Sequence, residues 1–169
     1  FGAKSVWLWA LANSLAGLAI GGAIHLFAQG DISARGLVPM SSFIEWRPEG
    51  GVKQPWLVTN EQQALAVAAL WDVWEGGEQP LLSCTLVTTA AAPQFEPWHK
   101  RMPVLLVGDE TDRWLNNSCE IPADDPLFRA ELKTPLRLQP LSRAVSNSRH
   151  KELQSLQGVG DVVELRQKE

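Results

Sequence analysis

The chain has 169 residues, of which 45% are hydrophobic and 20% are charged, and its formal net charge is −4. This composition fits one globular domain with a core of its own and excludes wholesale disorder. The negative net charge excludes binding of nucleic acid through overall charge, so such binding would need a local cluster of Arg and Lys. The two cysteines, Cys84 and Cys119, do not amount to a disulfide framework, and we expect a reducing cytoplasmic compartment.

Residues 1–30 are the part of the chain whose structure is hardest to predict from the sequence. Residues 5–30 carry no formal charge, and the run is long enough for a transmembrane helix. Asn13 and the glycine pair Gly21-Gly22 interrupt it, so we favour a buried strand followed by a helix over a membrane span. Because the chain starts at Phe1 and not at Met, we expect its amino-terminal segment to be missing.

Short apolar or β-branched runs, separated by turn residues, predict strands along the rest of the chain. We expect them at residues 37–46, 54–59, 64–71, 81–89, 102–107, 136–140 and 162–165. The turn residues 48–51 make the first two a hairpin, and Gly108-Asp109 begins a short helix over 111–115. We expect Cys84 to be a buried strand residue and Cys119 a loop thiol. Many short strands and few helices indicate a single β-rich α+β domain of mixed or antiparallel strands, extending over residues 1–169.

Several motifs of known chemistry are absent from the sequence. It contains no glycine-rich phosphate loop, Cys-x-x-Cys pair, His-Glu-x-x-His helix or Gly-x-Ser-x-Gly elbow. The three histidines, His25, His99 and His150, are too scattered to predict a metal site. We therefore expect neither a metal nor a cofactor.

Two short aromatic segments contain the remaining candidates for chemistry. Glu45 lies in Phe43-Ile44-Glu45-Trp46, and a carboxylate among aromatic rings tends to have a raised pKa, which suits proton transfer at neutral pH. His99 lies between Trp98 and Arg101 and would serve as an acid or base. The alternatives are a solvent-facing strand carboxylate and a loop histidine fixed by a backbone carbonyl. Arg101 is either an ordinary surface charge or a phosphate clamp.

Four segments occur in the order expected of one protein family. They are Arg35-Gly36-Leu37-Val38-Pro39-Met40-Ser41-Ser42-Phe43-Ile44-Glu45-Trp46, Leu86-Val87-Thr88-Thr89-Ala90, Trp98-His99-Lys100-Arg101-Met102-Pro103-Val104 and Pro140-Leu141-Ser142-Arg143-Ala144-Val145-Ser146-Asn147. In them the chain resembles the SRAP domain, the SOS-response-associated peptidase family. The resemblance covers residues 35–147 and is weak over 1–30.

This resemblance implies a compact β-rich fold with a basic groove for single-stranded DNA. Family members form a covalent thiazolidine crosslink to abasic sites through an N-terminal cysteine. The resemblance assigns proton handling to Glu45, sugar ring opening and imine chemistry to His99, and orientation of the nucleophile to Asn13. Thr88, Arg101 and Arg143 match positions for phosphate or sugar contacts. Trp46 is our candidate for stacking on an unpaired base.

The sequence departs from the family pattern near its start. The family's cysteine nucleophile would lie before Phe1, so this sequence does not contain it. Neither Cys84 nor Cys119 can replace it, because neither has an α-amine beside its thiol. Leu15 and Gly17 stand where the family has Arg and Glu. Two alternatives therefore stay open, namely a non-catalytic module that binds single-stranded DNA and an autoproteolytic peptidase, which would be a hydrolase.

The expected partner is single-stranded DNA with abasic sites, and we expect the protein to bind it as a monomer. We expect it to act in the DNA damage response of a bacterial cytoplasm, associated with the nucleoid and not with a membrane. Four cations near the carboxyl terminus support nucleic-acid binding: Arg137, Arg143, Arg149 and Lys151. Their alternative role is a solvated edge. Most of the eight tryptophans are expected in the core.

Overall fold

The computed structural model describes residues 34–75, 78–146 and 156–167. The strands in this part are β1 (Arg35–Met40), β2 (Ser42–Glu49), β3 (Val52–Thr59), β4 (Leu65–Trp74), β5 (Leu81–Leu86), β6 (Thr88–Ala90), β7 (Arg101–Pro103), β8 (Leu136–Pro140) and β9 (Val163–Leu165). The helices are α3 (Glu110–Leu115) and the 3₁₀ turns η1 (Pro126–Phe128) and η2 (Arg143–Ser146). The predicted β-rich α+β class is confirmed.

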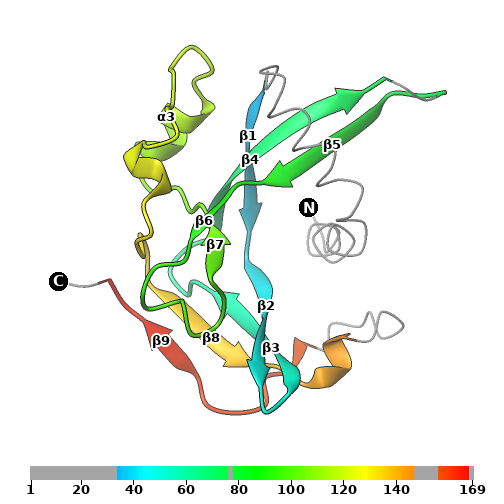
Figure 1. The fold of residues 1–169 in the computed structure, drawn as a ribbon, viewed down its shortest axis with the longest axis vertical. Helices are drawn as coiled ribbons and strands as arrows, with labels where there is room; N and C mark the ends of the chain where they lie inside the picture. Colours follow the sequence, from blue (N-terminus) through cyan, green and yellow to red (C-terminus); the bar gives the residue numbers. More distant parts are fainter. Residues whose placement is uncertain (1–33, 76–77, 147–155, 168–169) are drawn as a thin grey trace.

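The strands form three antiparallel sheets, in the orders β1-β4-β5, β2-β3-β8-β9 and β6-β7 (Figure 1). The predicted hairpin is β2–β3, in which Glu49 pairs with Val52 across Gly50 and Gly51. Both glycines have positive φ, 56° and 83°, as the type I′ turn of two-residue hairpins requires and as residues with side chains rarely adopt. This turn fixes which residues of β2 and β3 face each other.

Two of the expected strands are divided between sheets, and a third continues beyond its sheet. The run 37–46 bends at Ser41, so that β1 joins one sheet and β2 another. The run 81–89 likewise divides into β5 and β6. The run 102–107 is β7 followed by an extended segment, in which Val104 N donates to Val87 O and Ala68 N donates to Val104 O, both at 2.9 Å. A continuous apolar run predicts extended chain but does not say where that chain passes from one sheet to the next.

Two core clusters lie between these sheets. The larger one includes Phe43, Trp56, Val58, Leu65, Val67, Phe95, Trp98, Met102, Leu136 and Leu138. The smaller one, Ala68, Val104, Leu106, Trp114 and Leu127, packs α3 and η1 against β4. Trp114 also donates its indole N–H to Gly36 O at 2.8 Å, which ties α3 to β1.

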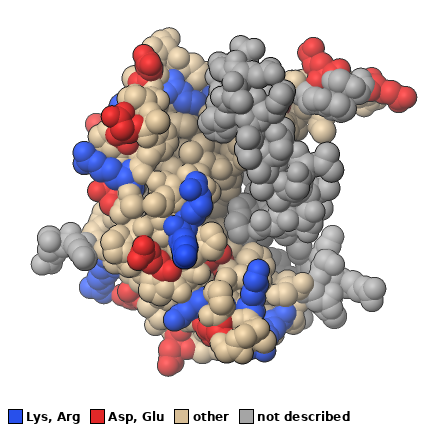
Figure 2. All heavy atoms as spheres, viewed as in Figure 1, with Lys and Arg blue, Asp and Glu red and all other residues tan. Residues whose placement is uncertain are grey.

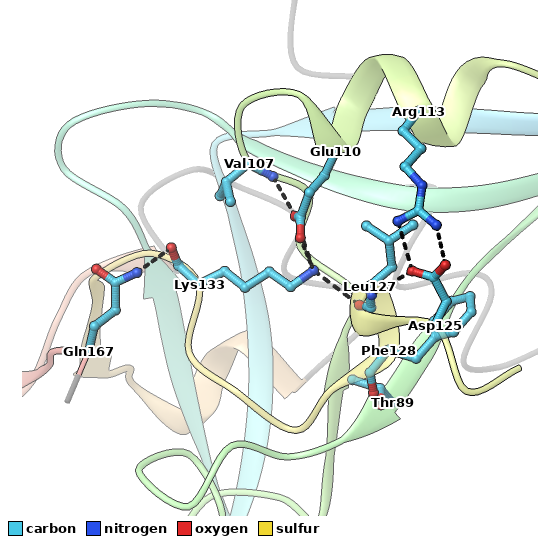
Figure 3. Close-up of polar contacts among 9 residues, drawn as sticks. All are labelled: Thr89, Val107, Glu110, Arg113, Asp125, Leu127, Phe128, Lys133 and Gln167. Carbon is cyan, nitrogen blue, oxygen red and sulfur yellow. Dashed lines mark hydrogen bonds and ion pairs between the residues drawn. The ribbon is translucent and has the colours of Figure 1, made fainter. Parts of the chain in front are cut away.

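A network of ion pairs holds the 107–133 region together (Figure 3). Lys133 Nζ contacts both carboxylate oxygens of Glu110, at 2.9 and 3.0 Å, and Leu127 O at 3.0 Å. Glu110 Oε2 also accepts a hydrogen bond from Val107 N at 3.0 Å. Asp125 pairs with Arg113, whose hydrogen bonds lower the pKa of the Asp125 carboxyl. Ion pairs between side chains thus hold α3, η1 and the loops around them together, which such short helices cannot do alone.

Beyond the core, β4 and β5 continue as a two-stranded arm that extends away from the other sheets (Figure 1). Cys84 is exposed on this arm, and Leu81 and Leu82 are 58% and 67% exposed. The prediction of a buried Cys84 is therefore wrong, because an apolar strand is buried only where a second layer covers it. In the described ranges no helix is long and apolar enough to cross a membrane. The predicted strand and helix of residues 1–30 lie outside those ranges.

Candidate functional site

Glu45 lies on the face of β2 that packs toward the larger core cluster. Side chains alternate along a strand, so Phe43, Glu45 and Arg47 share this face. Phe43 is 4% exposed, whereas Glu45 is half-buried. Directly across the hairpin, Glu45 faces Trp56 of β3. The carboxylate is thus placed beside a large aromatic ring at the edge of the core.

Burial of this carboxylate raises the pKa of Glu45 above its ordinary value. Two opposing effects lower the pKa, namely the charge of His99 and a hydrogen bond from Trp46 N to Glu45 Oε1 at 3.1 Å. Glu45 and His99 are therefore close enough for their charges to interact, although 54 positions separate them. Within the described structure their contact is electrostatic, without a hydrogen bond between the two side chains.

A compact turn between β6 and β7 holds His99 in this position. Phe95 N donates to Ala92 O at 2.8 Å, Trp98 N donates to Phe95 O at 2.9 Å, and Ala91 N donates to Lys100 O at 2.9 Å. Phe95 and Trp98 are buried and anchor the turn, whereas His99 is exposed. The anchoring rings are near those of the hairpin.

Ring contacts connect this turn to the face of the hairpin that carries Glu45. The ring centroids of Trp56 and Trp98 are 5.6 Å apart in an edge-on arrangement, and those of Phe43 and Phe95 are 6.4 Å apart. The core contacts therefore bring together the strand of Glu45 and the turn of His99.

The backbone of Arg101 engages one nitrogen of the imidazole. His99 Nδ1 lies 2.9 Å from Arg101 O and 3.1 Å from Arg101 N. Nδ1 accepts from the N–H when it carries no proton and donates to the carbonyl when it does, so the two bonds are alternatives. In the described structure Nε2 makes no hydrogen bond, which makes it the ring nitrogen available for exchanging a proton with a substrate.

Arg101 and Thr88 form a second pair at this site. The guanidinium donates to Thr88 Oγ1 from Nε at 3.0 Å and from Nη2 at 2.6 Å, and Nη2 also donates to Thr88 O at 2.7 Å. Both residues are exposed. Thr88 thereby holds the exposed guanidinium in a fixed orientation, a geometry suited to an anionic oxygen.

The other predicted site residues lie elsewhere. Alternation along β2 directs Trp46 to the face opposite Glu45, where its indole N–H donates to Ser146 Oγ of η2 at 3.3 Å. Arg143 begins η2 and is exposed. Asn13 falls outside the described residues, as do Arg149 and Lys151. The structure thus links Glu45 to His99, His99 to the backbone of Arg101, and Arg101 to Thr88, while Trp46 and Arg143 lie with η2.

One hollow in the described structure, of about 710 Å³, lies away from Glu45 and His99. Its lining includes Asn60, Arg137, Glu164 and Arg166. Its arginines are both paired, Arg137 with Glu61 at 3.0 Å and Arg166 with Glu164 at 2.8 Å. The charge pairing leaves this hollow without free cationic character. Among the described residues, no group of three or more His, Cys, Asp and Glu side chains could hold a metal ion.

The charged side chains do not form one continuous basic surface in the view of Figure 2. On that face Lys and Arg are interspersed with Asp and Glu. A nucleic-acid contact on it would therefore depend on individual guanidinium groups and not on a broad positive field.

Sequence reasoning missed two residues of this site, Arg47 and Trp56. Arg47 lies two positions after Glu45 and therefore on the same face of the strand, and the Gly50-Gly51 turn sets Trp56 opposite Glu45. The predicted hairpin already contained both features, namely the alternation of side chains along the strand and the position of its turn.

Comparison with known proteins agrees with the motifs. The family described as SOS response associated peptidase (SRAP) matches residues 24–148. The chain belongs to this family. It is 31% identical over 137 residues to the abasic site processing protein HMCES of Xenopus tropicalis, and this alignment covers 69% of the chain and 41% of that protein. It is also 36% identical over 88 residues to the abasic site processing protein YoaM of Bacillus subtilis, covering 50% of the chain and 39% of that protein.

The chain therefore spans about two fifths of the length of these SRAP relatives. A solved structure of a Bacteroides thetaiotaomicron protein shares the fold, with a TM-score of 0.63 and 20% identity. The superposition covers 76% of this chain and 58% of that one.

Proposed function

We propose that this SRAP chain is the part of a larger protein that acts on abasic sites in single-stranded DNA, in the damage response of a bacterial cytoplasm at the nucleoid. The observation that carries the proposal is that packing of Trp56 on Trp98 and of Phe43 on Phe95 brings Glu45 and His99 within range of each other's charge. A half-buried carboxylate with a raised pKa and an exposed imidazole are a suitable pair for moving protons at neutral pH. Relatives named for abasic site processing support the choice of substrate.

The proposed reaction begins with the open form of the abasic sugar, which carries an aldehyde. The α-amine of an N-terminal cysteine, outside the sequence printed here, adds to the aldehyde carbon, and loss of one water gives an imine. The cysteine sulfur then bonds to the imine carbon and the thiol proton passes to nitrogen, which closes a thiazolidine ring. His99 assists the ring opening and protonates the departing hydroxyl from Nε2, and Glu45 accepts and returns protons. Asn13 orients the nucleophile.

The DNA backbone would be held by guanidinium groups. Arg101, oriented by Thr88, follows His99 by two residues and would contact a phosphate flanking the abasic sugar. Arg143 supplies a second phosphate contact from η2, and Trp46 a stacking surface for a neighbouring base.

A crosslinking experiment tests this function. The full-length gene product, beginning with its cysteine, is mixed with a single-stranded oligonucleotide containing one abasic site and run on a denaturing gel after heating. We expect a heat-stable shifted band. Its rate of formation should fall about 100-fold or more in Glu45→Gln and His99→Gln, because each substitution removes a proton-transfer group.

The matched control is Glu120→Gln, an exposed carboxylate outside the site, which should react at the wild-type rate. Absence of a band from the full-length protein would overturn the covalent reaction. Retained binding without a band would favour the non-catalytic module, and unchanged rates in both site variants would remove Glu45 and His99 from the chemistry.

A further inference from the structure

Four side chains between the β2–β3 hairpin and the turn of His99 form a closed ring of contacts. Arg47 lies over the ring of Trp98, with its guanidinium carbon 5.2 Å from the centroid. Arg47 Nε is 3.7 Å from Glu49 Oε1, and the same oxygen accepts a hydrogen bond from Trp56 Nε1 at 3.1 Å. The Trp56 ring closes the circuit against Trp98. Three members belong to the hairpin and one to the turn.

Trp98 is the member whose position matters for His99, because the two residues are adjacent. It is 6% exposed, and within the described structure its indole N–H has no hydrogen-bond partner. Contacts with its ring therefore determine its orientation. Phe95 and Trp56 supply apolar contacts, and Arg47 supplies the only cation over its face in the described part of the chain.

The hairpin side of this ring is rigidly related to Glu45. Arg47 shares a face of β2 with Glu45, and Trp56 lies directly opposite it on β3. A displacement of Trp98 relative to Arg47 and Trp56 would therefore move His99 relative to Glu45.

We propose that Arg47 is a positioning residue that holds the 91–100 turn against the β2–β3 hairpin and keeps the imidazole of His99 within electrostatic range of the Glu45 carboxylate. The role rests on the proposed function only in that these two groups then act on DNA. Arginine suits it because a planar, weakly hydrated guanidinium stacks on an indole while its charge attracts the Glu49 carboxylate. Glu49 fixes the guanidinium from one side and Trp56 fixes Glu49.

The test measures the interaction between Glu45 and His99 by a double-substitution cycle, with no DNA present. The pKa of Glu45 is measured from the NMR resonance of its side-chain carboxyl carbon in protein with labelled glutamate. The full chain is used for the wild type, His99→Gln, Arg47→Met and the double variant. In the wild-type background His99→Gln should raise the pKa of Glu45, because the His99 charge lowers it. In the Arg47→Met background that rise should shrink to less than half.

The cycle removes the direct effect of the Arg47 charge, and of Glu49, Lys100 and Arg101 nearby, because each is constant within a background. Arg166→Met, which removes an exposed paired arginine elsewhere, should leave the rise unchanged. Arg47→Lys keeps a positive charge but loses the planar guanidinium, so it should restore only part of the rise. An undiminished rise in Arg47→Met would overturn the proposal.

If Arg47→Met does not fold, Glu49→Gln weakens the same ring from its other end and should diminish the rise in the same direction. An undiminished rise there would likewise overturn the positioning role. Failure of the abasic-site reaction would leave these titrations readable, so the two proposals fail separately.

Discussion

At the scale of single residues, the protonation of Glu45 depends on two opposing neighbours. Burial beside Trp56 favours the neutral acid, whereas the charge of His99 favours the carboxylate, and burial is the larger effect. The folded protein therefore binds this proton more tightly than the unfolded chain does. Stability contributed by the neutral acid is lost as pH rises through the interval between the ordinary and the raised pKa.

Glu45→Gln should consequently stabilise the protein above that interval and leave it little changed below. We expect a gain of at most about 1 kcal/mol in the free energy of unfolding at pH 8, because the side chain is partly solvated. Denaturant unfolding at a series of pH values measures it. Glu120→Gln should leave the pH dependence of stability as in the wild type, and a Glu45→Gln protein less stable than wild type at pH 8 would contradict the expected sign.

At the scale of elements, the short helices depend on charged side chains for their attachment. The Lys133 side chain is 6% exposed, and its ammonium group joins Glu110 of α3 to the carbonyl of Leu127 in η1 (Figure 3). Removing Lys133 leaves the Glu110 carboxylate, 28% exposed, without its cation, which is more damaging than removing both members.

Lys133→Met should therefore destabilise the protein by about 3 kcal/mol in chemical denaturation. Combining it with Glu110→Gln should recover part of the loss, since no buried charge then stays unpaired. The matched control is Arg166→Met, whose ion pair with Glu164 is 80% and 56% exposed and should contribute about 1 kcal/mol or less. Equal losses from Lys133→Met and Arg166→Met would show that burial does not distinguish the two pairs.

At the scale of the whole molecule, the net charge of −4 sets how DNA can be held. Attraction must come from a few local cations, and on the face in Figure 2 these are mixed with acidic groups. The salt dependence of binding counts such contacts, with a slope of about −0.7 per phosphate neutralised on a single strand.

Arg101→Ala and Arg143→Ala should each make this slope shallower by about 0.7, measured by fluorescence anisotropy with an abasic oligonucleotide over a salt series. Arg166→Met, whose guanidinium is already paired, should leave the slope unchanged. Unchanged affinity and slope in both site variants would exclude these arginines from the DNA contact.

Local patterns were sufficient for much of the secondary structure. The Gly50-Gly51 turn predicted the β2–β3 hairpin, and aromatic neighbours marked Glu45 and His99 as candidates. Those predictions depend on interactions within a few residues, such as turn geometry and side-chain alternation, which a sequence contains directly.

Only the tertiary structure decided which surfaces were covered and which distant residues met. Cys84 is exposed because β4 and β5 leave the core, and the single expected strand 37–46 belongs to two sheets. His99 comes within range of the Glu45 charge because two rings of the 91–100 turn pack on Phe43 and Trp56. These contacts join residues that are far apart in the sequence. Burial depends on the layer that another part of the chain supplies, so no local pattern contains it.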